Sequence, residues 1–213
     1  MTASPWIKIC GLTDVDNALD VAALGPDAIG LVFFEKSPRN VSIGQAGTIC
    51  AALPDSIMPV GVFVDEPYEK VLGIAQTCAL KGVQLHGGES PDMVARLLDQ
   101  GLTVIKGLFA TRPPYLSQAP EYSHASYLLI EYGKGTLPGG NAESWDYEIS
   151  RQLDTDVPVI LAGGLDADNV REAIQKARPA GVDISSNVEA RPGFKDIKKV
   201  KYFIRLTRST HYI

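Results

Sequence analysis

A thiol at the end of an apolar run is the first group in this chain that could do chemistry. Cys10 follows the run at residues 6–9 and precedes Gly11, and a helix is expected from residue 14, with Thr13 as its N-cap. Cys10 would then lie at the carboxyl end of a strand, where α/β proteins place reactive groups. A thiol there could act as a base or nucleophile, although a lone cysteine is more often a small buried hydrophobic residue.

Lys8 lies two positions before Cys10, so both side chains point to the same side of the strand. An ammonium beside the thiol would lower the thiol pKa and favour the thiolate. Cys50 and Cys78 fall near expected helices and are interpreted as packing residues. No pair of the three cysteines has metal-ligand spacing, so we predict free thiols and no metal site.

Three other polar residues, Arg39, His86 and Glu131, follow apolar runs further along the chain. The guanidinium of Arg39 could bind an anionic group, and its alternative is a surface ion pair. His86 could line the site or act in catalysis, and its alternative is a hydrogen-bonded structural histidine. Glu131 could act as general acid or base, and its alternative is a carboxylate solvated at a strand tip.

Two later loops predict a phosphate site. Gly163 and Gly164 allow the backbone to approach a ligand closely, and Ser185 and Ser186 offer hydroxyl and amide donors. The loops after strands seven and eight of a barrel often bind phosphate, with N–H groups at a helix N-terminus facing the anion. The alternative is a tight turn at the glycines and helix capping by the serines.

Eight apolar runs alternate with amphipathic segments, without a hairpin or a linker between them. The expected strands cover residues 6–9, 28–33, 59–64, 82–85, 102–108, 127–131, 157–161 and 181–184. The expected helices cover residues 14–24, 42–53, 67–77, a segment from 90, 113–120, 144–153, 168–177 and 195–207. This alternation predicts the α/β class, with one (β/α)8 barrel domain over residues 1–213.

A doubly wound open sheet is the alternative fold, but its Gly-x-Gly-x-x-Gly signature is absent after the first strand. In a barrel, the carboxyl ends of all strands converge on one mouth, and the candidate residues would meet there.

The bulk composition argues against two classes of partner. The chain has 213 residues and a net charge of −5, without a long basic stripe, so no nucleic-acid partner is expected. The one dense basic run, Lys195, Lys198, Lys199 and Lys201, is predicted on the solvated side of the last helix. No apolar stretch predicts a membrane span, and no N-terminal signal segment is recognised, so a cytoplasmic protein is expected.

Five motifs occur in order along nearly the whole chain, at residues 8–13, 37–39, 84–87, 162–165 and 181–186. Together they resemble the phosphoribosylanthranilate isomerase family of tryptophan biosynthesis, as does the Pro-Gly-x-Lys-Asp segment at residues 192–196. The resemblance implies a (β/α)8 barrel and a cofactor-free Amadori rearrangement of N-(5'-phosphoribosyl)anthranilate to an aminodeoxyribulose phosphate. It also implies a small phosphorylated substrate and a monomer or homodimer.

The family uses a cysteine after strand one as general base and an aspartate after strand six as general acid. By resemblance, Cys10 removes the proton from C2 of the opened sugar, and Glu131 protonates the ring oxygen. Substrate binding is assigned to Lys8, Arg39, which would hold the anthranilate end, and His86. Phosphate binding is assigned to Gly163, Gly164, Ser185 and Ser186.

The chain departs from the family pattern at the mouth. Glu131 replaces the aspartate, and a shift of the acid by about 1 Å can cost as much as ~100-fold in rate. Asn187 replaces a glycine and tolerates left-handed backbone angles, whereas Ala142 tolerates them less well in its own loop. These changes keep open a paralogous barrel enzyme acting on another phosphorylated sugar derivative, or an inactive homologue that binds a phosphorylated ligand.

Overall fold

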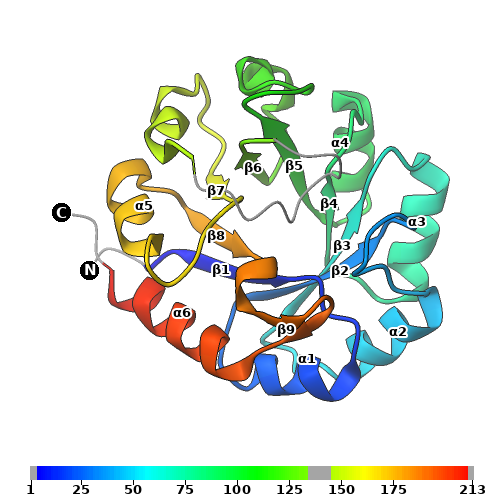
Figure 1. The fold of residues 1–213 in the computed structure, drawn as a ribbon. Helices are drawn as coiled ribbons and strands as arrows, with labels where there is room; N and C mark the ends of the chain where they lie inside the picture. The colour runs from blue at the N-terminus through cyan, green and yellow to red at the C-terminus, as the bar shows by residue number, and fades with distance from the viewer. Residues whose placement is uncertain (1–3, 134–144, 211–213) are drawn as a thin grey trace.

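The computed structural model describes residues 4–133 and 145–210. Eight parallel strands pair in sequence order, and the eighth pairs with the first, so the sheet closes into a barrel (Figure 1). The strands are β1 (Trp6–Cys10), β2 (Ala28–Phe33), β3 (Met58–Phe63), β4 (Gly82–Leu85), β5 (Thr103–Phe109), β6 (Tyr127–Glu131), β7 (Val159–Leu161) and β8 (Gly181–Ile184). The predicted (β/α)8 barrel is therefore confirmed, and the doubly wound sheet is excluded.

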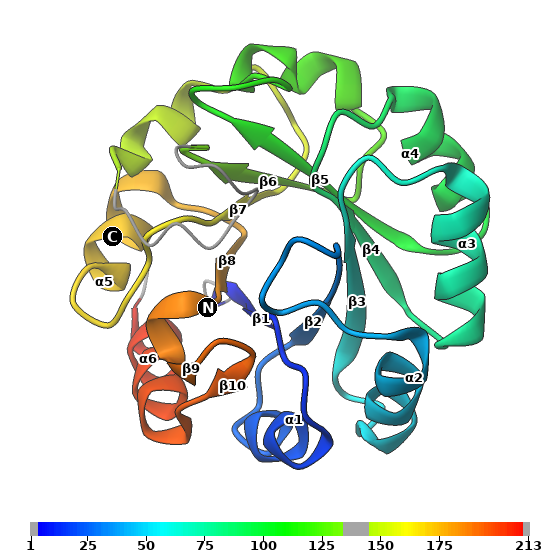
Figure 2. The same cartoon turned by 45° about the vertical axis from the view of Figure 1, so that its right-hand side comes forward.

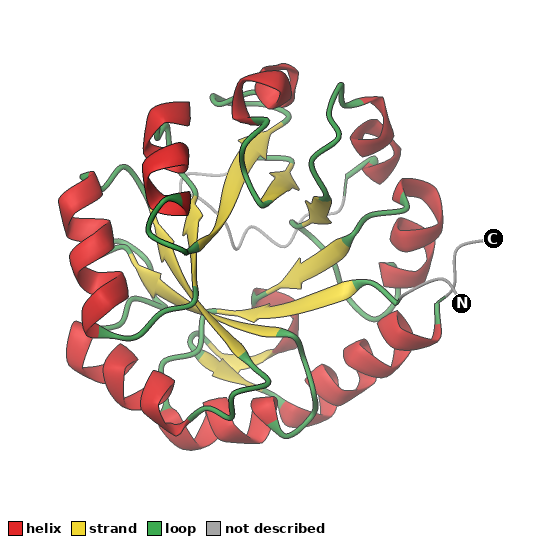
Figure 3. Ribbon diagram, turned by 180° about the vertical axis from the view of Figure 1, so that it is seen from behind, coloured by secondary structure: helices red, strands yellow, loops and turns green. Residues whose placement is uncertain are grey.

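Helices form an outer ring around the strands (Figure 3). The α-helices are α1 (Val15–Ala22), α2 (Ile43–Ala52), α3 (Tyr68–Thr77), α4 (Pro91–Leu98), α5 (Val170–Ala177) and α6 (Ile197–Ser209). Within the described residues, three segments are 3-10 helices: η1 (Leu116–Tyr122), η2 (Tyr147–Gln152) and η3 (Ser186–Val188). No helix in the described part of the chain has the length and apolar character that crossing a bilayer requires.

The expected helices at 113–120 and 144–153 are 3-10 helices where the structure describes them. Pro120 lies inside η1 and has no N–H to donate, so it cannot continue an α-helical ladder. In η2 the Ser150 hydroxyl donates to the carbonyl of Tyr147 at 2.7 Å, a bond that accompanies the tighter turn.

The last unit contains a hairpin that the sequence analysis did not expect. Strands β9 (Glu189–Arg191) and β10 (Phe194–Lys195) form a two-stranded antiparallel sheet between β8 and α6, with β10 against α1 (Figure 2). The prediction of an uninterrupted last unit is wrong because residues 192 and 193, Pro-Gly, turn the chain, with Gly193 at φ +82°. The helix after the hairpin begins at Ile197, capped by Asp196.

The start of α1 also differs from the prediction. Asp14, and not Thr13, is the N-cap, since its side chain accepts a hydrogen bond from the Asn17 N–H at 2.9 Å. The hydroxyl of Thr13 instead donates to the carbonyl of Gly193 at 3.0 Å. The turn after β1 is thereby tied to the hairpin.

Two apolar regions form the core. The larger lies between the strands and the surrounding helices. The smaller fills the barrel interior and consists of Ala28, Val60, Ile105, Leu129, Ile160 and Ala162. Trp6 packs against this interior cluster, and since side chains alternate along a strand, Lys8 and Cys10 also point into the barrel. The polar side chains of the barrel therefore lie on one side of this apolar interior cluster, toward the carboxyl ends of the strands.

Candidate active site

The carboxyl ends of the strands enclose a pocket in the barrel mouth. Eight of the nine predicted site residues line this pocket: Cys10, Arg39, His86, Glu131, Gly163, Gly164, Ser185 and Ser186. The ninth, Lys8, is fully buried deeper in the interior and does not line it. Apolar side chains that the sequence analysis did not single out, including Phe34 and Val62, form part of the wall.

Cys10 is held in a space that β2 leaves open. Gly30 pairs with Cys10 in the parallel register, and a Cβ on Gly30 would lie 2.6 Å from the Sγ atom. Burial raises the thiol pKa above its usual value, although the charges of Lys8 and Lys195 act in the opposite direction. The predicted low pKa is therefore wrong, because the cost of burying a thiolate outweighs the effect of the neighbouring ammonium groups.

Lys8 forms a buried ion pair with Asp183 on the adjacent strand β8. The two residues are partners in the β1–β8 register, and the Nζ and Oδ1 atoms lie 2.8 Å apart. Burial acts to lower the pKa of Lys8, but Asp183 and the Cys10 thiol together raise it above its usual value. Since Asp183 lines the pocket and Lys8 does not, any effect of Lys8 on a ligand is indirect.

Glu131 and His86 face each other across the ends of β6 and β4. The Glu131 Oε2 atom lies 3.2 Å from His86 Nε2, and both side chains are buried. The Gln84 Nε2 group lies 3.1 Å from His86 Nδ1. The Gln84 amide therefore contacts the Nδ1 side of the imidazole ring, while Nε2 faces the carboxyl group. Glu131 is therefore oriented by a histidine and is not solvated at a strand tip.

The turn after β7 fits closely under Glu131. Gly163 has φ +80°, and a Cβ at this position would lie 2.8 Å from Glu131 Cγ. The Tyr147 hydroxyl donates to the Gly163 carbonyl at 3.0 Å, and the Trp145 indole N–H donates to the Ala162 carbonyl at 3.0 Å. Trp145 and Tyr147 therefore fix the turn that packs against the Glu131 side chain.

The loop after β8 joins two parts of the mouth. Ser185 donates from its hydroxyl to the Cys10 carbonyl at 3.0 Å, and Ser186 opens the short helix η3. Asn187 is within this right-handed turn, so its tolerance of left-handed angles is not used. Its side-chain amide instead donates to the Leu165 carbonyl at 2.9 Å and links the two predicted phosphate loops. Ala142 lies outside the described residues.

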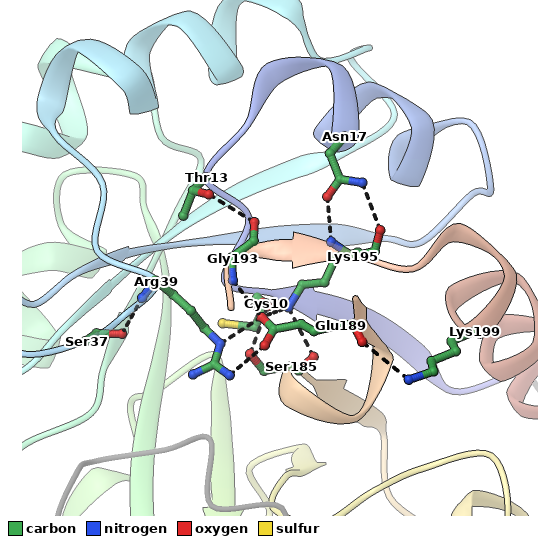
Figure 4. Close-up of polar contacts among 10 residues, drawn as sticks. All are labelled: Cys10, Thr13, Asn17, Ser37, Arg39, Ser185, Glu189, Gly193, Lys195 and Lys199. Atoms are coloured by element: carbon green, nitrogen blue, oxygen red, sulfur yellow. Dashed lines mark hydrogen bonds and ion pairs between the residues drawn. The ribbon is translucent and has the colours of Figure 1, made fainter. Parts of the chain in front are cut away.

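Arg39 forms part of a buried charge cluster beside Cys10 (Figure 4). Its Nε and Nη2 atoms donate to the two carboxylate oxygens of Glu189, at 2.8 Å and 2.7 Å. The Nζ atom of Lys195 lies 2.9 Å from Glu189 Oε1 and 3.1 Å from the Ser185 carbonyl. Burial opposes the charge on Glu189, but the hydrogen bonds from Arg39 and the charge of Lys195 hold its pKa below the usual value.

Lys195 is 1% exposed, so its predicted place on the solvated side of the last helix is wrong. It belongs to β10, and the hairpin turns its side chain toward the barrel. Sequence reasoning also missed Asp183 and Glu189. A signal for Asp183 was present, since one acidic residue in the apolar run at 181–184 needs a counter-charge.

Eight parallel strands closed into a barrel, with a thiol, a carboxyl group and glycine- and serine-containing loops at one mouth, define a (β/α)8-barrel enzyme. A family model described as N-(5'-phosphoribosyl)anthranilate (PRA) isomerase matches residues 7–206. The chain belongs to this family.

Similar proteins and a solved structure support this family assignment. The chain is 48% identical to the N-(5'-phosphoribosyl)anthranilate isomerase of Desulfatibacillum aliphaticivorans, over 96% of this chain and 93% of the relative. It is 40% identical to that of Rubrobacter xylanophilus, over 95% and 98%. The crystal structure of the Thermotoga maritima phosphoribosylanthranilate isomerase superposes with a TM-score of 0.85 at 35% identity, covering 98% of this chain and 99% of that one.

Proposed function

We propose that the protein converts N-(5'-phosphoribosyl)anthranilate to 1-(2-carboxyphenylamino)-1-deoxyribulose 5-phosphate in tryptophan biosynthesis. One observation carries the proposal: Cys10 on β1 and Glu131 on β6, which are not neighbouring strands, line the same pocket as the two predicted phosphate loops. A related isomerase, 34% identical with a TM-score of 0.81, has been crystallised with reduced 1-(o-carboxyphenylamino)-1-deoxyribulose 5-phosphate. That ligand has a carboxyphenyl group and a phosphate, the two groups that this pocket would have to bind.

Ring opening is the first step, and Glu131 acts as the acid. Its protonated carboxyl group donates to the sugar ring oxygen while the C1–O bond breaks and the anthranilate nitrogen forms an iminium. His86 and the Gly163 turn hold the carboxyl group for this transfer.

Proton abstraction is the second step, and Cys10 acts as the base. The iminium makes the C2 proton acidic, and the thiolate removes it. The released electron pair forms the C1=C2 double bond and neutralises the nitrogen. The resulting enol takes up a proton at C1 and loses the proton of its C2 hydroxyl, which gives the C2 ketone. Protons taken and released balance, so the rearrangement consumes no oxidant or reductant.

Two groups of residues bind the ends of the substrate. Gly163, Gly164, Ser185 and Ser186 bind the phosphate through backbone N–H groups, with the hydroxyl of Ser186 as a further donor. Arg39 binds the anthranilate carboxylate through the guanidinium N–H groups that Glu189 does not occupy. Phe34 and Val62 offer apolar contact to the aromatic ring.

The remaining expectations are part of the same proposal. The whole chain, residues 1–213, is one barrel domain. Its location is the cytoplasm, where cysteines stay reduced, and its assembly is a monomer or homodimer. A Thermotoga maritima relative is described as dimeric.

Steady-state turnover of phosphoribosylanthranilate by the purified protein tests the proposal, together with rescue of a tryptophan auxotroph that lacks this step. Turnover and rescue, both lost in Cys10→Ser, support it. Turnover of a different phosphorylated sugar derivative alone indicates a paralogous enzyme. Binding of the reduced product analogue without turnover indicates an inactive homologue.

A further inference from the structure

Lys195 is a buried cation that the reaction scheme above does not use. Its side chain is fully buried, and it contacts Glu189 and the carbonyl of Ser185. Ser185 in turn donates from its hydroxyl to the carbonyl of Cys10. Ser185 thus connects the ammonium of Lys195 to the backbone of Cys10 through two hydrogen bonds. The ammonium also interacts electrostatically with the thiol.

The fold fixes this position from outside the pocket. Asn17 accepts a hydrogen bond from the Lys195 backbone N–H at 2.7 Å and donates to its carbonyl at 3.0 Å. Thr13 holds the Gly193 carbonyl at the turn of the hairpin. These bonds fix the backbone of Lys195, and the contacts with Glu189 and the Ser185 carbonyl hold its ammonium.

Glu189 is the anion between two cations of the cluster beside Cys10. It pairs with Arg39 and Lys195 at once and also accepts from the Gly193 N–H at 3.1 Å. Lys8 and Asp183 form a separate, internally neutral pair. In the cluster of Arg39, Lys195 and Glu189, two cations face one anion, which leaves one net positive charge beside the thiol.

The other elements packed around Cys10 add little charge of their own. On β2 the thiol faces Gly30. His86 and Glu131 line the same pocket and already pair with each other. Among residues 4–133 and 145–210, the charged and titratable groups around the thiol are Lys8 on β1, Asp183 on β8, Glu189 on β9, Lys195 on β10, Arg39 before α2, and the His86–Glu131 pair.

We propose that Lys195 and Glu189 are positioning residues for the base: Lys195 stabilises the Cys10 thiolate, and Glu189 limits that stabilisation while it holds Arg39 toward the substrate. This rests on the proposed role of Cys10. It gives the hairpin β9–β10 a purpose, since the hairpin supplies both residues. It also reduces the cost that burial imposes on the Cys10 thiolate, although burial still holds the thiol pKa above its usual value.

The test follows the alkylation rate of Cys10 by iodoacetamide as a function of pH, with peptide mass spectrometry separating Cys10 from Cys50 and Cys78. Lys195→Met raises the apparent pKa of Cys10 by about one unit, because an opposite charge nearby shifts a pKa by ~1–3 units. Glu189→Gln lowers it, because Arg39 stays charged and loses its counter-ion. Lys198→Met removes the same charge from an exposed position three residues further on and leaves the midpoint unchanged.

The kinetic readout separates the two roles. The pH profile of kcat/KM moves to higher pH in Lys195→Met, whereas Glu189→Gln also raises KM because Arg39 is no longer held. Equal alkylation midpoints in wild type and both variants overturn the proposal. If Lys195→Met does not fold, Glu189→Gln decides alone, and a midpoint that stays or rises overturns it. A separate result tests the role of Cys10 itself: full turnover by Cys10→Ser would show that Cys10 is not the base.

Discussion

Glu131 has a longer reach than the family's aspartate, and the surrounding residues match that length. Its Oε2 atom contacts His86 Nε2 at 3.2 Å, and its Cγ atom rests against the Gly163 turn. A shorter carboxyl side chain on the same backbone would leave His86 without this partner. The glutamate is therefore interpreted as an adapted acid and not as a misplaced aspartate.

We predict that Glu131→Asp lowers kcat by about 10- to 100-fold, since a displacement of ~1 Å has an effect of this size. Glu131→Gln, which keeps the length but cannot donate the proton, lowers kcat by about 1,000-fold. Steady-state kinetics at saturating substrate measure both. An aspartate variant as fast as wild type would show that the contact with His86 does not position the acid.

Gly163→Ala tests the turn under Glu131. The new Cβ would lie 2.8 Å from Glu131 Cγ at a backbone φ of +80°, so we expect kcat/KM to fall by about tenfold or more, with a loss of stability of about 1–2 kcal/mol. Gly25→Ala is the matched control, because Gly25 has φ +74° and nothing within 4 Å of its added Cβ. The control loses similar stability in urea unfolding and keeps its activity. Equal kinetics in the two variants would contradict the prediction.

At the scale of elements, the sequence predicted what local patterns can encode. The eight buried strands follow from continuous apolar runs, and closure follows from eight strand–helix units in a short chain. Once the barrel is predicted, Cys10 and Glu131 are expected at the same mouth, because both lie at carboxyl ends of strands. The turn of the hairpin has a local signal, Pro-Gly at residues 192 and 193. The burial of Lys195 depends on contacts such as that with Asn17, 178 residues away in sequence, which no local pattern encodes.

Asn17 joins α1 to β10, and its removal should weaken this connection. Asn17→Ala leaves the buried N–H and C=O of Lys195 without their partners, so we expect a loss of about 3 kcal/mol in the free energy of unfolding. Asp14→Ala removes the cap of the same helix and costs about 1 kcal/mol. Urea unfolding compares the two. An Asn17 variant no less stable than the Asp14 variant would show that the hairpin does not depend on this side chain.

At the scale of the molecule, the barrel separates an apolar base from a charged mouth. Buried ion pairs join Lys8 to Asp183, Lys195 to Glu189, and Lys106 to Glu89. Lys106 also donates to the Gly87 carbonyl at 2.6 Å and so fixes the loop that follows His86. Buried charges of this kind are a weak source of stability, and here they hold the loops that form the site.

These charges make stability depend on pH, and Glu189 gives the sign. Its folded pKa lies below the unfolded value, so above the unfolded value the carboxylate stabilises the fold, and this contribution is lost as the pH falls through the folded pKa. We expect Glu189→Gln to be less stable than wild type at pH ~7 and the difference to shrink toward pH ~3. Glu172→Gln is the control, since its pair with Lys176 is exposed and contributes little at any pH. Urea unfolding across this range measures both variants, and a constant difference between wild type and Glu189→Gln would show that the cluster does not depend on this ionisation.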